Sequence, residues 1–472
     1  MKNSKNVLLL IALLLVCILP LSAQETEVTE KETPPPGGEP RNFTLPEKTI
    51  VNFDNGLSLV MIPWGSVPKA TIQVVIKSGN IHEGENEVWL SDLVADLLKE
   101  GSVSKSGNDI ADAMAGMGGE LNIGVGLHTT TGSANVLYEF APDAISLLAD
   151  VLMNPSFPEA ELERLIKDRQ RQVNVSMSRP QPKARQDFFA KIYPDHPYGR
   201  IYPTEEMLGS YTLDQLKTFY GNNYGAQRTT VYVAGKFDQK AVEEAVKASL
   251  GTWDKGKESF YPVAEPVTGA SVSIIDRPDA PQSTIMMGLP ILDPSHPDWV
   301  ALSVTNSLLG GSFGSRITKN IREDKGYTYS PRSSVSTNYK SAVWYESADV
   351  TTADTGPSLR EITKEIYLLQ DETPSAEELE GIQNYNAGIF VLQNSTPRGI
   401  IGQMVTMDIH ELEDTYLTDY VKKIYEVTPE KVQEITKKYI DPEKMTLVLV
   451  GDKKIIEKQI EEYNRAKEDY NN

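Results

Sequence analysis

A glycine-rich segment followed by an arginine and a tyrosine is the part of this sequence whose residue types could handle a peptide. The segment comprises Gly310, Gly311, Ser312, Phe313 and Gly314, and it is followed by Arg322 and Tyr329. Glycines in such a segment would let the backbone approach an extended peptide, or they would simply form a turn. The glycines alone leave both interpretations open.

The elements that would position the arginine and the tyrosine can be predicted from the flanking residues. Residues 315–325 favour a short helix ended by Gly326, and strand-forming residues follow from Tyr327. Arg322 would then lie in the last helical turn, and Tyr329 would project from the next strand. An arginine there could also merely stabilise the helix end, and the tyrosine could merely pack in the sheet.

A second pair of residues with chemical potential is Asp92 and Asp96, on a helix predicted over residues 88–99 and ended by Gly101. Residues four apart lie on one helical face, so the two carboxylates would be neighbours. They could chelate Ca²⁺ or Mg²⁺ weakly, but these ions require more oxygen ligands. The plainer interpretation is a polar wall of a cleft.

The surrounding sequence alternates strand and helix patterns. Residues 57–62 and 71–76 predict two strands of a hairpin, and residues 158–173 predict a charged helix. A further helix over 212–220 has Thr212 as its N-cap, and residues 229–235 predict a closing strand. This pattern predicts an α+β fold in which helices pack on a mainly antiparallel sheet.

The same pattern occurs twice along the chain. Ile62, Pro68, Thr71 and Ile72 recur 213 residues later as Ile275, Pro281, Thr284 and Ile285; Trp89, Leu98 and Gly101 recur 210 residues later as Trp299, Leu308 and Gly311. We therefore predict two tandem homologous α/β sandwich domains, at 46–255 and 269–472, joined by a linker at 256–268.

These motifs together resemble the insulinase/pitrilysin family of metallopeptidases, the inverted zincins, in the short two-domain form of mitochondrial processing peptidase subunits. The resemblance covers about residues 46–460. It rests on five segments, namely Gly56-Leu57, Gly118-Gly119-Glu120-Leu121-Asn122, His196-Pro197-Tyr198-Gly199-Arg200, the glycine-rich segment and residues 321–330. The histidine of the third segment is expected to belong to a structural turn.

The resemblance implies a zinc site in the first half, but this chain has lost its residues. Active members carry His-x-x-Glu-His on the first helix and a glutamate ligand about 75 residues further on. Alignment through Leu98 and Gly101 places Asp92, Ala95 and Asp96 at the motif, and the count reaches Gln170. We therefore expect no metal in this chain, and zinc in a partner subunit.

The second half, in contrast, keeps the residues that the resemblance assigns to the substrate. The spacing of Arg322 and Tyr329 matches the substrate-clamping pair of the family. By resemblance, Tyr329 would donate its phenol O–H to the developing oxyanion, and Arg322 would hold a carbonyl or a carboxylate with its fork of donors. Both would act in trans to the zinc site of a partner, and residues 310–314 would bind substrate.

The start of the chain predicts export. Lys2 and Lys5 precede an apolar run over residues 7–19, and Ala23 ends the predicted cleavage region, so residues 1–23 are typical of a signal peptide. Residues 24–45 predict a disordered tether. Cys17 is the only cysteine, and it lies in the leader. We expect a bacterial periplasmic protein, which would contact the membrane only if the leader were kept as an anchor.

Composition narrows the class of partner. The formal net charge is −20, which disfavours nucleic acid because such a partner requires a basic surface. The acidic balance could attract basic peptides, although solubility alone explains it more simply.

The sequence thus predicts a zinc-less subunit of an exported zinc metallopeptidase that pairs with a zinc-bearing homologue and acts on unfolded peptides. The alternative is a pseudoenzyme that only binds or scaffolds. An independent hydrolase is disfavoured because none of the histidines lies beside a recognisable triad partner in the sequence.

Overall fold

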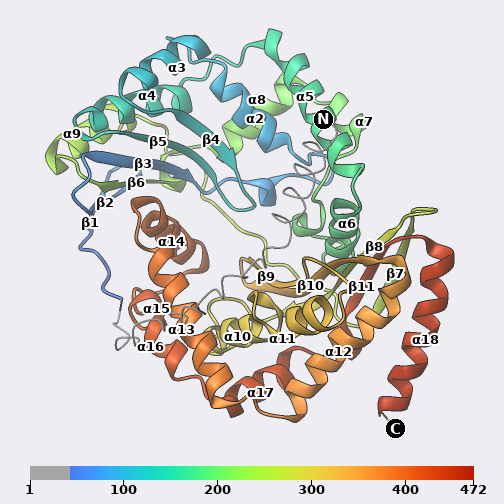
Figure 1. Ribbon diagram of the computed structural model, residues 1–472. Helices are drawn as coiled ribbons and strands as arrows, with labels where there is room; N and C mark the ends of the chain where they lie inside the picture. Colours follow the sequence, from blue (N-terminus) through green and yellow to red (C-terminus); the bar gives the residue numbers. More distant parts are fainter. Residues whose placement is uncertain (1–42, 472) are drawn as a thin grey trace, which may run out of the picture. The chain divides into compact units, whose positions relative to one another are not determined.

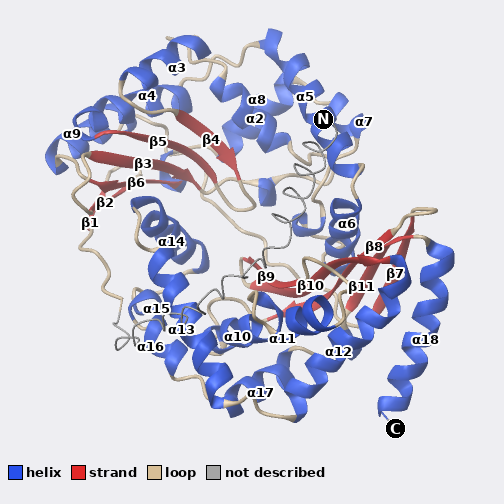
Figure 2. Cartoon of the chain, in the orientation of Figure 1, coloured by secondary structure: helices blue, strands red, loops and turns tan. Residues whose placement is uncertain are grey.

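The elements of the fold are seen in a computed structural model that describes residues 43–471 (Figures 1 and 2). The leader predicted at 1–23, and all but the end of the tether predicted at 24–45, lie outside the described residues. Within residues 43–471, none of the helices combines the length and the apolar character that a membrane span requires.

The first half is built on a six-stranded sheet in the order β1-β2-β6-β3-β5-β4. Its strands are β1 (Thr49–Asn52), β2 (Ser58–Pro63), β3 (Lys69–Ile76), β4 (Leu121–Val125), β5 (Thr130–Leu137) and β6 (Thr229–Gly235). All neighbours pair antiparallel except β2 and β6. This confirms the predicted mainly antiparallel sheet.

The second half repeats this topology in a five-stranded sheet, β7-β11-β8-β10-β9. Its strands are β7 (Ser271–Asp276), β8 (Gln282–Ile291), β9 (Arg332–Asn338), β10 (Ser341–Thr351) and β11 (Thr446–Gly451). The register is kept as well, because Ser58 pairs with Thr230 in the first sheet and Ser271 pairs with Thr446 in the second. The two sheets therefore confirm the tandem repeat.

One sequence prediction about the sheet is wrong. β2 and β3 do not form a hairpin pair, because β6 lies between them. β6 is almost entirely buried, as is its counterpart β11. A strand that is apolar on both faces is favoured in the centre of a sheet rather than at its edge, so the closing strand of each half separates the first two.

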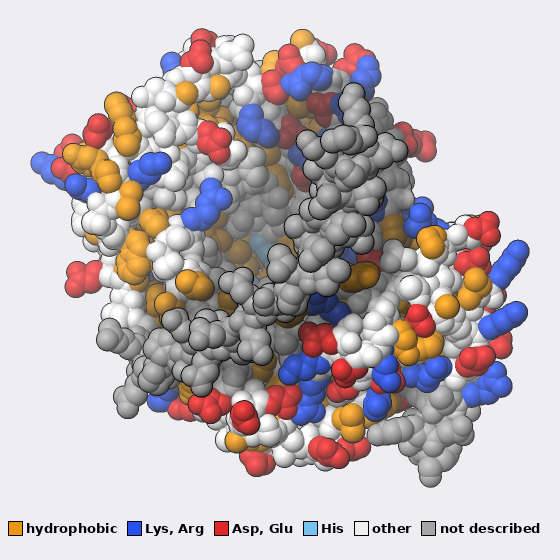
Figure 3. All heavy atoms as spheres, viewed as in Figure 1, with side chains coloured by type: hydrophobic (Ala, Val, Ile, Leu, Met, Phe, Trp, Pro, Cys, Tyr) orange, Lys and Arg blue, Asp and Glu red, His pale blue; other side chains and the backbone are white. Residues whose placement is uncertain are grey.

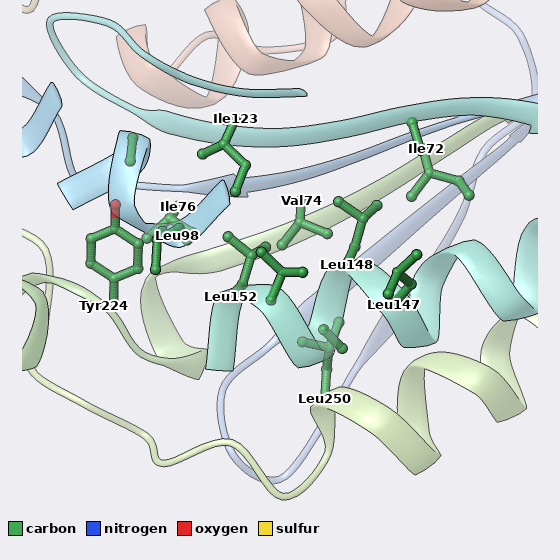
Figure 4. Close-up of a cluster of buried hydrophobic side chains, with 14 of the residues drawn as sticks. Ile72, Val74, Ile76, Leu98, Ile123, Leu147, Leu148, Leu152, Tyr224 and Leu250 are labelled. Atoms are coloured by element: carbon green, nitrogen blue, oxygen red, sulfur yellow. The ribbon is translucent and has the colours of Figure 1, made fainter. Parts of the chain in front are cut away.

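The helices and the short helical turns of the first half are η1 (Asn80–His82), α2 (Leu90–Lys99), α3 (Gly107–Gly116), η2 (Tyr138–Phe140), α4 (Ala141–Met153), α5 (Glu159–Met177), α6 (Pro180–Ile192), η3 (Pro197–Gly199), α7 (Glu205–Gly209), α8 (Leu213–Asn223), η4 (Ala226–Arg228) and α9 (Gln239–Leu250). The helices other than α6, among them α4, cover one face of the sheet of this half. Figure 4 shows part of the core, where Leu148 and Leu152 of α4 meet Ile72 and Val74 of β3. Burial of such side chains contributes roughly 1.5–3 kcal/mol each.

The second half has a matching set of helices. They are α10 (Trp299–Asn306), η5 (Ser307–Gly311), α11 (Arg316–Thr318), η6 (Lys319–Asp324), η7 (Thr352–Asp354), α12 (Thr355–Asp371), α13 (Ala376–Gln393), α14 (Pro397–His410), α15 (Thr415–Thr418), α16 (Tyr420–Tyr425), α17 (Pro429–Tyr439), η8 (Pro442–Lys444) and α18 (Lys453–Asn471). Their core includes Trp344 of β10, which is fully buried and donates its indole N–H to Asn306 Oδ1 at 2.8 Å.

Each half also contributes one helix to the sheet of the other half. α6 packs on β8 and β11, and α14 packs on β3 and β6 (Figure 1). Phe188 of α6 lies in one cluster with Val448 of β11, and Ile401 of α14 lies in another with Tyr232 of β6. Because each sheet is covered partly by the other half, the two halves stabilise one another.

The surface carries side chains of both charges (Figure 3), as the composition of the chain leads one to expect. On the face drawn in Figure 3, Lys and Arg side chains are interspersed with Asp and Glu side chains. Both signs of charge therefore occur over that face.

Candidate functional site

α2 places Asp92 and Asp96 on the face that meets α5. The opposite face of this helix is apolar, and Leu93, Leu97 and Leu98 are fully buried in the core. The core therefore fixes the rotation of α2, which turns both aspartates toward α5. Ala95 is buried beside them and carries no group that could bind a ligand or move a proton.

The guanidinium of Arg169 from α5 bridges the two aspartates. Its Nε lies 2.7 Å from Asp96 Oδ2 and its Nη1 lies 3.1 Å from Asp92 Oδ1. The exposed fractions of the three side chains are 17% for Arg169, 17% for Asp92 and 14% for Asp96. The carboxylates are thus neutralised by a cation of the same chain, in a setting partly shielded from water.

The remaining oxygens of the pair are also engaged. Asn80 donates its side-chain N–H to Asp92 Oδ2 at 2.9 Å, and Lys99 Nζ lies 2.9 Å from Asp96 Oδ1. Burial raises the pKa of Asp92, against the opposing effects of Arg169 and Asn80. All four carboxylate oxygens therefore have a partner within the chain.

Gln170 does not join this cluster, although the residue count places it at the third position of the zinc site. Its Nε2 donates to the carbonyl of Glu205 at 3.0 Å, which ties α5 to α7. Successive helical residues point about 100° apart, so Arg169 rather than Gln170 faces the aspartates. The compensating arginine was visible in the sequence only as a cation beside the expected position.

Glu83 is a residue of this region that sequence reasoning missed. Its carboxyl accepts hydrogen bonds from the backbone N–H groups of Trp89 and Ser91, at 3.0 and 2.9 Å, and from the side chain of Asn80 at 3.1 Å. These bonds cap the start of α2, where the helix leaves N–H groups unsatisfied. Burial raises the pKa of Glu83 to about 7.

A π-helical turn, η5, continues α10 and ends with Gly310 and Gly311, and the other residues of the glycine-rich segment follow it. A Cβ on Gly310 would lie 2.7 Å from Ser333 Oγ and 2.8 Å from Glu346 Oε2, and a Cβ on Gly311 would lie 2.5 Å from Asn306 Nδ2. These two glycines are therefore required by packing against β9, β10 and α10. Gly314 differs, because a Cβ there would meet no heavy atom within 4 Å.

Glu346, beneath Gly310, was also missed. Its side chain is fully buried in β10, and burial raises the pKa of its carboxyl well above the usual range. A glutamate at an inward position of a strand gives no distinguishing sequence signal.

Arg322 and Phe313 are in contact. The guanidinium carbon of Arg322 lies 4.2 Å from the centroid of the Phe313 ring, and Arg322 Nη1 is buried with no hydrogen-bond partner among the described residues. Phe313 itself is 68% exposed. The contact orients the guanidinium by a cation–π interaction and leaves one donor atom unsatisfied.

Tyr329 is 90% exposed. The prediction that it projects from a strand is wrong, because β9 begins only at Arg332. Thr328 makes an isolated bridge with Val350, and Pro331, which has no N–H, follows before regular pairing starts. Tyr329 therefore lies in a connecting segment. Ser312 is buried, whereas the phenol of Tyr329 is accessible.

The turn over His196–Arg200 is structural, as predicted. His196 Nδ1 accepts the N–H of Tyr198 at 3.2 Å, and η3 follows. A Cβ on Gly199 would lie 2.2 Å from the carbonyl oxygen of Tyr193, so only glycine fits there.

Two models of one peptidase family match the chain in tandem. The insulinase (peptidase family M16) model matches residues 62–203, and the peptidase M16 inactive domain model matches residues 210–386. The chain belongs to the insulinase family of peptidases.

Curated relatives agree with this assignment to the insulinase family. An uncharacterized zinc protease of Mycobacterium leprae is 29% identical over 281 residues, which cover 58% of this chain and 63% of that protein. The uncharacterized zinc protease YmxG of Bacillus subtilis is 28% identical over 278 residues, which cover 58% and 67%. The chain thus spans about two thirds of the length of these relatives.

Solved structures share the fold. A protease from Helicobacter pylori matches with a TM-score of 0.81 at 18% identity, over 86% of this chain and 100% of that chain. A peptidase M16 inactive domain from Pseudomonas fluorescens matches with a TM-score of 0.79 at 22% identity, over 86% and 98%. The periplasmic protease PqqL from Escherichia coli matches with a TM-score of 0.75 at 15% identity, over 88% and 46%.

The residues at the family's zinc positions do not fit the ion in this chain. Asp92 and Asp96 are saturated by Arg169, Asn80 and Lys99, and Ala95 has no donor atom. The cation of Arg169 would also repel Zn²⁺. Within residues 43–471, no group of three or more His, Cys, Asp or Glu side chains is arranged to hold a metal.

Proposed function

We propose that this insulinase-family chain is the zinc-less subunit of an exported zinc metallopeptidase. It would supply Arg322, Tyr329 and the glycine-rich segment to a homologous partner that bears the zinc. The observation that supports the proposal is the bridge of Arg169 between Asp92 and Asp96, because it engages both carboxylates at the positions where the family resemblance puts zinc.

In this proposal Tyr329 and Arg322 have different tasks. The phenol of Tyr329 donates its O–H toward the oxygen on which negative charge develops during peptide hydrolysis. The guanidinium of Arg322, oriented by Phe313, offers its fork of donors to a carbonyl or carboxylate of the substrate. When bound in the partner, zinc would activate the attacking water. Export to the bacterial periplasm belongs to the same proposal.

The test is purification of the native protein from its source, with metal analysis and peptide cleavage on the eluate. We expect a co-purifying homologue with His-x-x-Glu-His, zinc in that homologue, and cleavage of unfolded peptides. Recovery of this chain alone, without metal or activity, would contradict the proposal.

The second candidate is a binding or scaffold subunit with no part in proteolysis, which the closed Arg169 cluster also suits. It is distinguished by Arg322→Ala and Tyr329→Phe in the purified complex. If this chain is only a scaffold, both variant complexes should cleave peptides at the wild-type rate. If it supplies the half-site, both should lose cleavage although the complex stays assembled.

A further inference from the structure

A cavity of about 310 Å³ adjoins the cluster of Arg169, Asp92 and Asp96. Residues of both halves line it, among them Asn80, Trp89, Arg185 and Arg200 from the first half and Ser336 and Asn338 from β9. Asn80 donates to Asp92, and the Trp89 ring lies 5.7 Å from the Arg169 guanidinium, so the cavity and the cluster share a wall.

The charge of this cavity is opposite to that of the chain. The described residues that line it include Arg185 and Arg200 and include neither Asp nor Glu, although the formal net charge of the chain is −20. Among residues 43–471, neither arginine makes an ion pair within 4.0 Å. The hydrogen-bond partners of these arginines are neutral, namely the Tyr345 hydroxyl at 3.5 Å from Arg185 Nη1 and the Glu83 carbonyl at 3.4 Å from Arg200 Nη2.

Carboxylates around the cavity do not satisfy these two arginines. Asp349, which lines a second cavity together with Arg185, accepts hydrogen bonds from Gln181 at 2.8 Å and from Thr284 at 2.5 Å. Asp92 and Asp96 are bridged by Arg169, and the Glu83 carboxyl is engaged by the start of α2. Two arginines, Arg200 half-buried and Arg185 exposed, therefore line one cavity without a carboxylate partner. In a partly enclosed space such groups favour an anion, because carboxylates match their planar fork of donors.

The walls suit a peptide. The cavity is bounded by the apolar surfaces of Trp89, Leu127 and Phe189 and by the amides of Asn80 and Asn338. The Trp89 indole N–H donates to the Ile201 carbonyl at 2.9 Å, which fixes the ring. The lining thus mixes apolar surfaces with many polar groups, and the volume is at the lower end of that of ligand sites. It suits one side chain or a chain terminus.

We propose that this cavity binds a carboxylate of the peptide substrate through Arg185 and Arg200. The carboxylate would be an acidic side chain or the free C-terminus. The inference rests on the proposed function in treating peptides as ligands, but it requires neither the partner nor hydrolysis. It gives this chain a substrate preference of its own, separate from Arg322 and Tyr329.

The test is binding of short labelled peptides to the full chain by fluorescence anisotropy, at low and at high salt. One peptide carries a single glutamate between blocked ends, a second has glutamine at that position, and a third has the glutamine with a free C-terminus. We expect the glutamate or the free-terminus peptide to bind at least about tenfold more tightly than the blocked glutamine peptide. The preference should shrink at high salt.

Arg185→Gln and Arg200→Gln should each abolish the preference. Arg179→Gln is the matched control, because it removes the same charge next to α6 from a residue outside the cavity. Equal binding of all peptides, no binding, or an equal effect of Arg179→Gln would overturn the inference. Failure of the proposed function would look different, since carboxylate binding would persist while no zinc-bearing partner co-purified.

Discussion

Arg169 Nε lies 2.7 Å from Asp96 Oδ2, so α5 is tied to α2 by an ion pair at the place where the family resemblance puts zinc. The same guanidinium reaches Asp92, so one cation neutralises two carboxylates. The cluster keeps a polar surface between the two helices and removes the coordination chemistry. The positions at which the resemblance puts zinc are thus bridged by an arginine.

Removal of this cation should destabilise the fold. Arg169→Gln leaves two largely buried carboxylates facing each other, so we expect the free energy of unfolding to fall by about 2–3 kcal/mol in urea titrations. Arg171→Gln, on the same helix but 70% exposed, is the control and should change it by less than about 0.5 kcal/mol. Equal effects of the two substitutions would show that the bridge is not stabilising.

The arginine should also prevent recovery of a metal site. In the triple variant Asp92→His, Ala95→Glu, Asp96→His, we expect no stoichiometric zinc while Arg169 is present, because its charge repels the ion and its side chain lies between the ligands. Adding Arg169→Ala should raise the zinc content measured after dialysis. The same zinc content with and without Arg169 would contradict this explanation.

The glycines of the segment should separate into two classes. Gly310→Ala should destabilise the protein by about 1–3 kcal/mol, because its Cβ would approach Ser333 and Glu346 too closely. Gly314→Ala, where a Cβ meets no atom within 4 Å, should leave stability unchanged and weaken peptide binding if backbone approaches backbone there. Thermal unfolding and peptide binding of both variants test this. Unchanged peptide binding in Gly314→Ala would favour a simple turn.

Acid should weaken the junction between the halves. His128 Nε2 accepts the backbone N–H of Tyr339 at 3.3 Å, which joins the β4–β5 connection to the β9–β10 turn. Burial lowers the pKa of His128 to about 3 and that of His82 to about 4. The unfolded chain takes up these protons near pH 6.5, before the folded chain does, so the free energy of unfolding should fall as pH decreases from about 6.5 to about 4.

The measurement for this pH dependence is urea unfolding at several pH values. His128→Gln should reduce the slope of the free energy of unfolding against pH. One such histidine contributes about 1.4 kcal/mol per pH unit to this slope. His296→Gln, at a histidine that packs on Tyr439 away from this junction, is the control. An unaltered slope in His128→Gln would exclude His128 as its source.

Much of the fold could be predicted from local patterns. Thr212 caps α8 as expected, and β6 has the predicted bounds, because caps and apolar runs are encoded within a few neighbouring residues. The insertion of β6 between β2 and β3 could not be predicted in this way, since it depends on which strand best fills the centre of the sheet. The exchange of α6 and α14 likewise depends on contacts between distant residues.

The candidate site likewise has some features that the sequence predicts and others that depend on contacts between distant residues. That Asp92, Ala95 and Asp96 stand at the zinc positions of the family follows from the resemblance and stays a prediction. That Arg169 bridges the two aspartates could not be predicted from the sequence, because it depends on the rotation of α5 against α2. The role of Arg322 and Tyr329 remains a prediction, to which the structure adds the contact with Phe313 and the accessible phenol.

The most direct test of the central claim is peptide cleavage by the assembled pair with Tyr329→Phe in this chain. The side chain is 90% exposed, so the variant should fold and assemble normally. We predict a loss of about 10²–10³-fold in kcat with little change in KM, as for removal of one oxyanion donor. An unchanged kcat in the fully assembled pair would contradict the half-site and leave the scaffold as the better account.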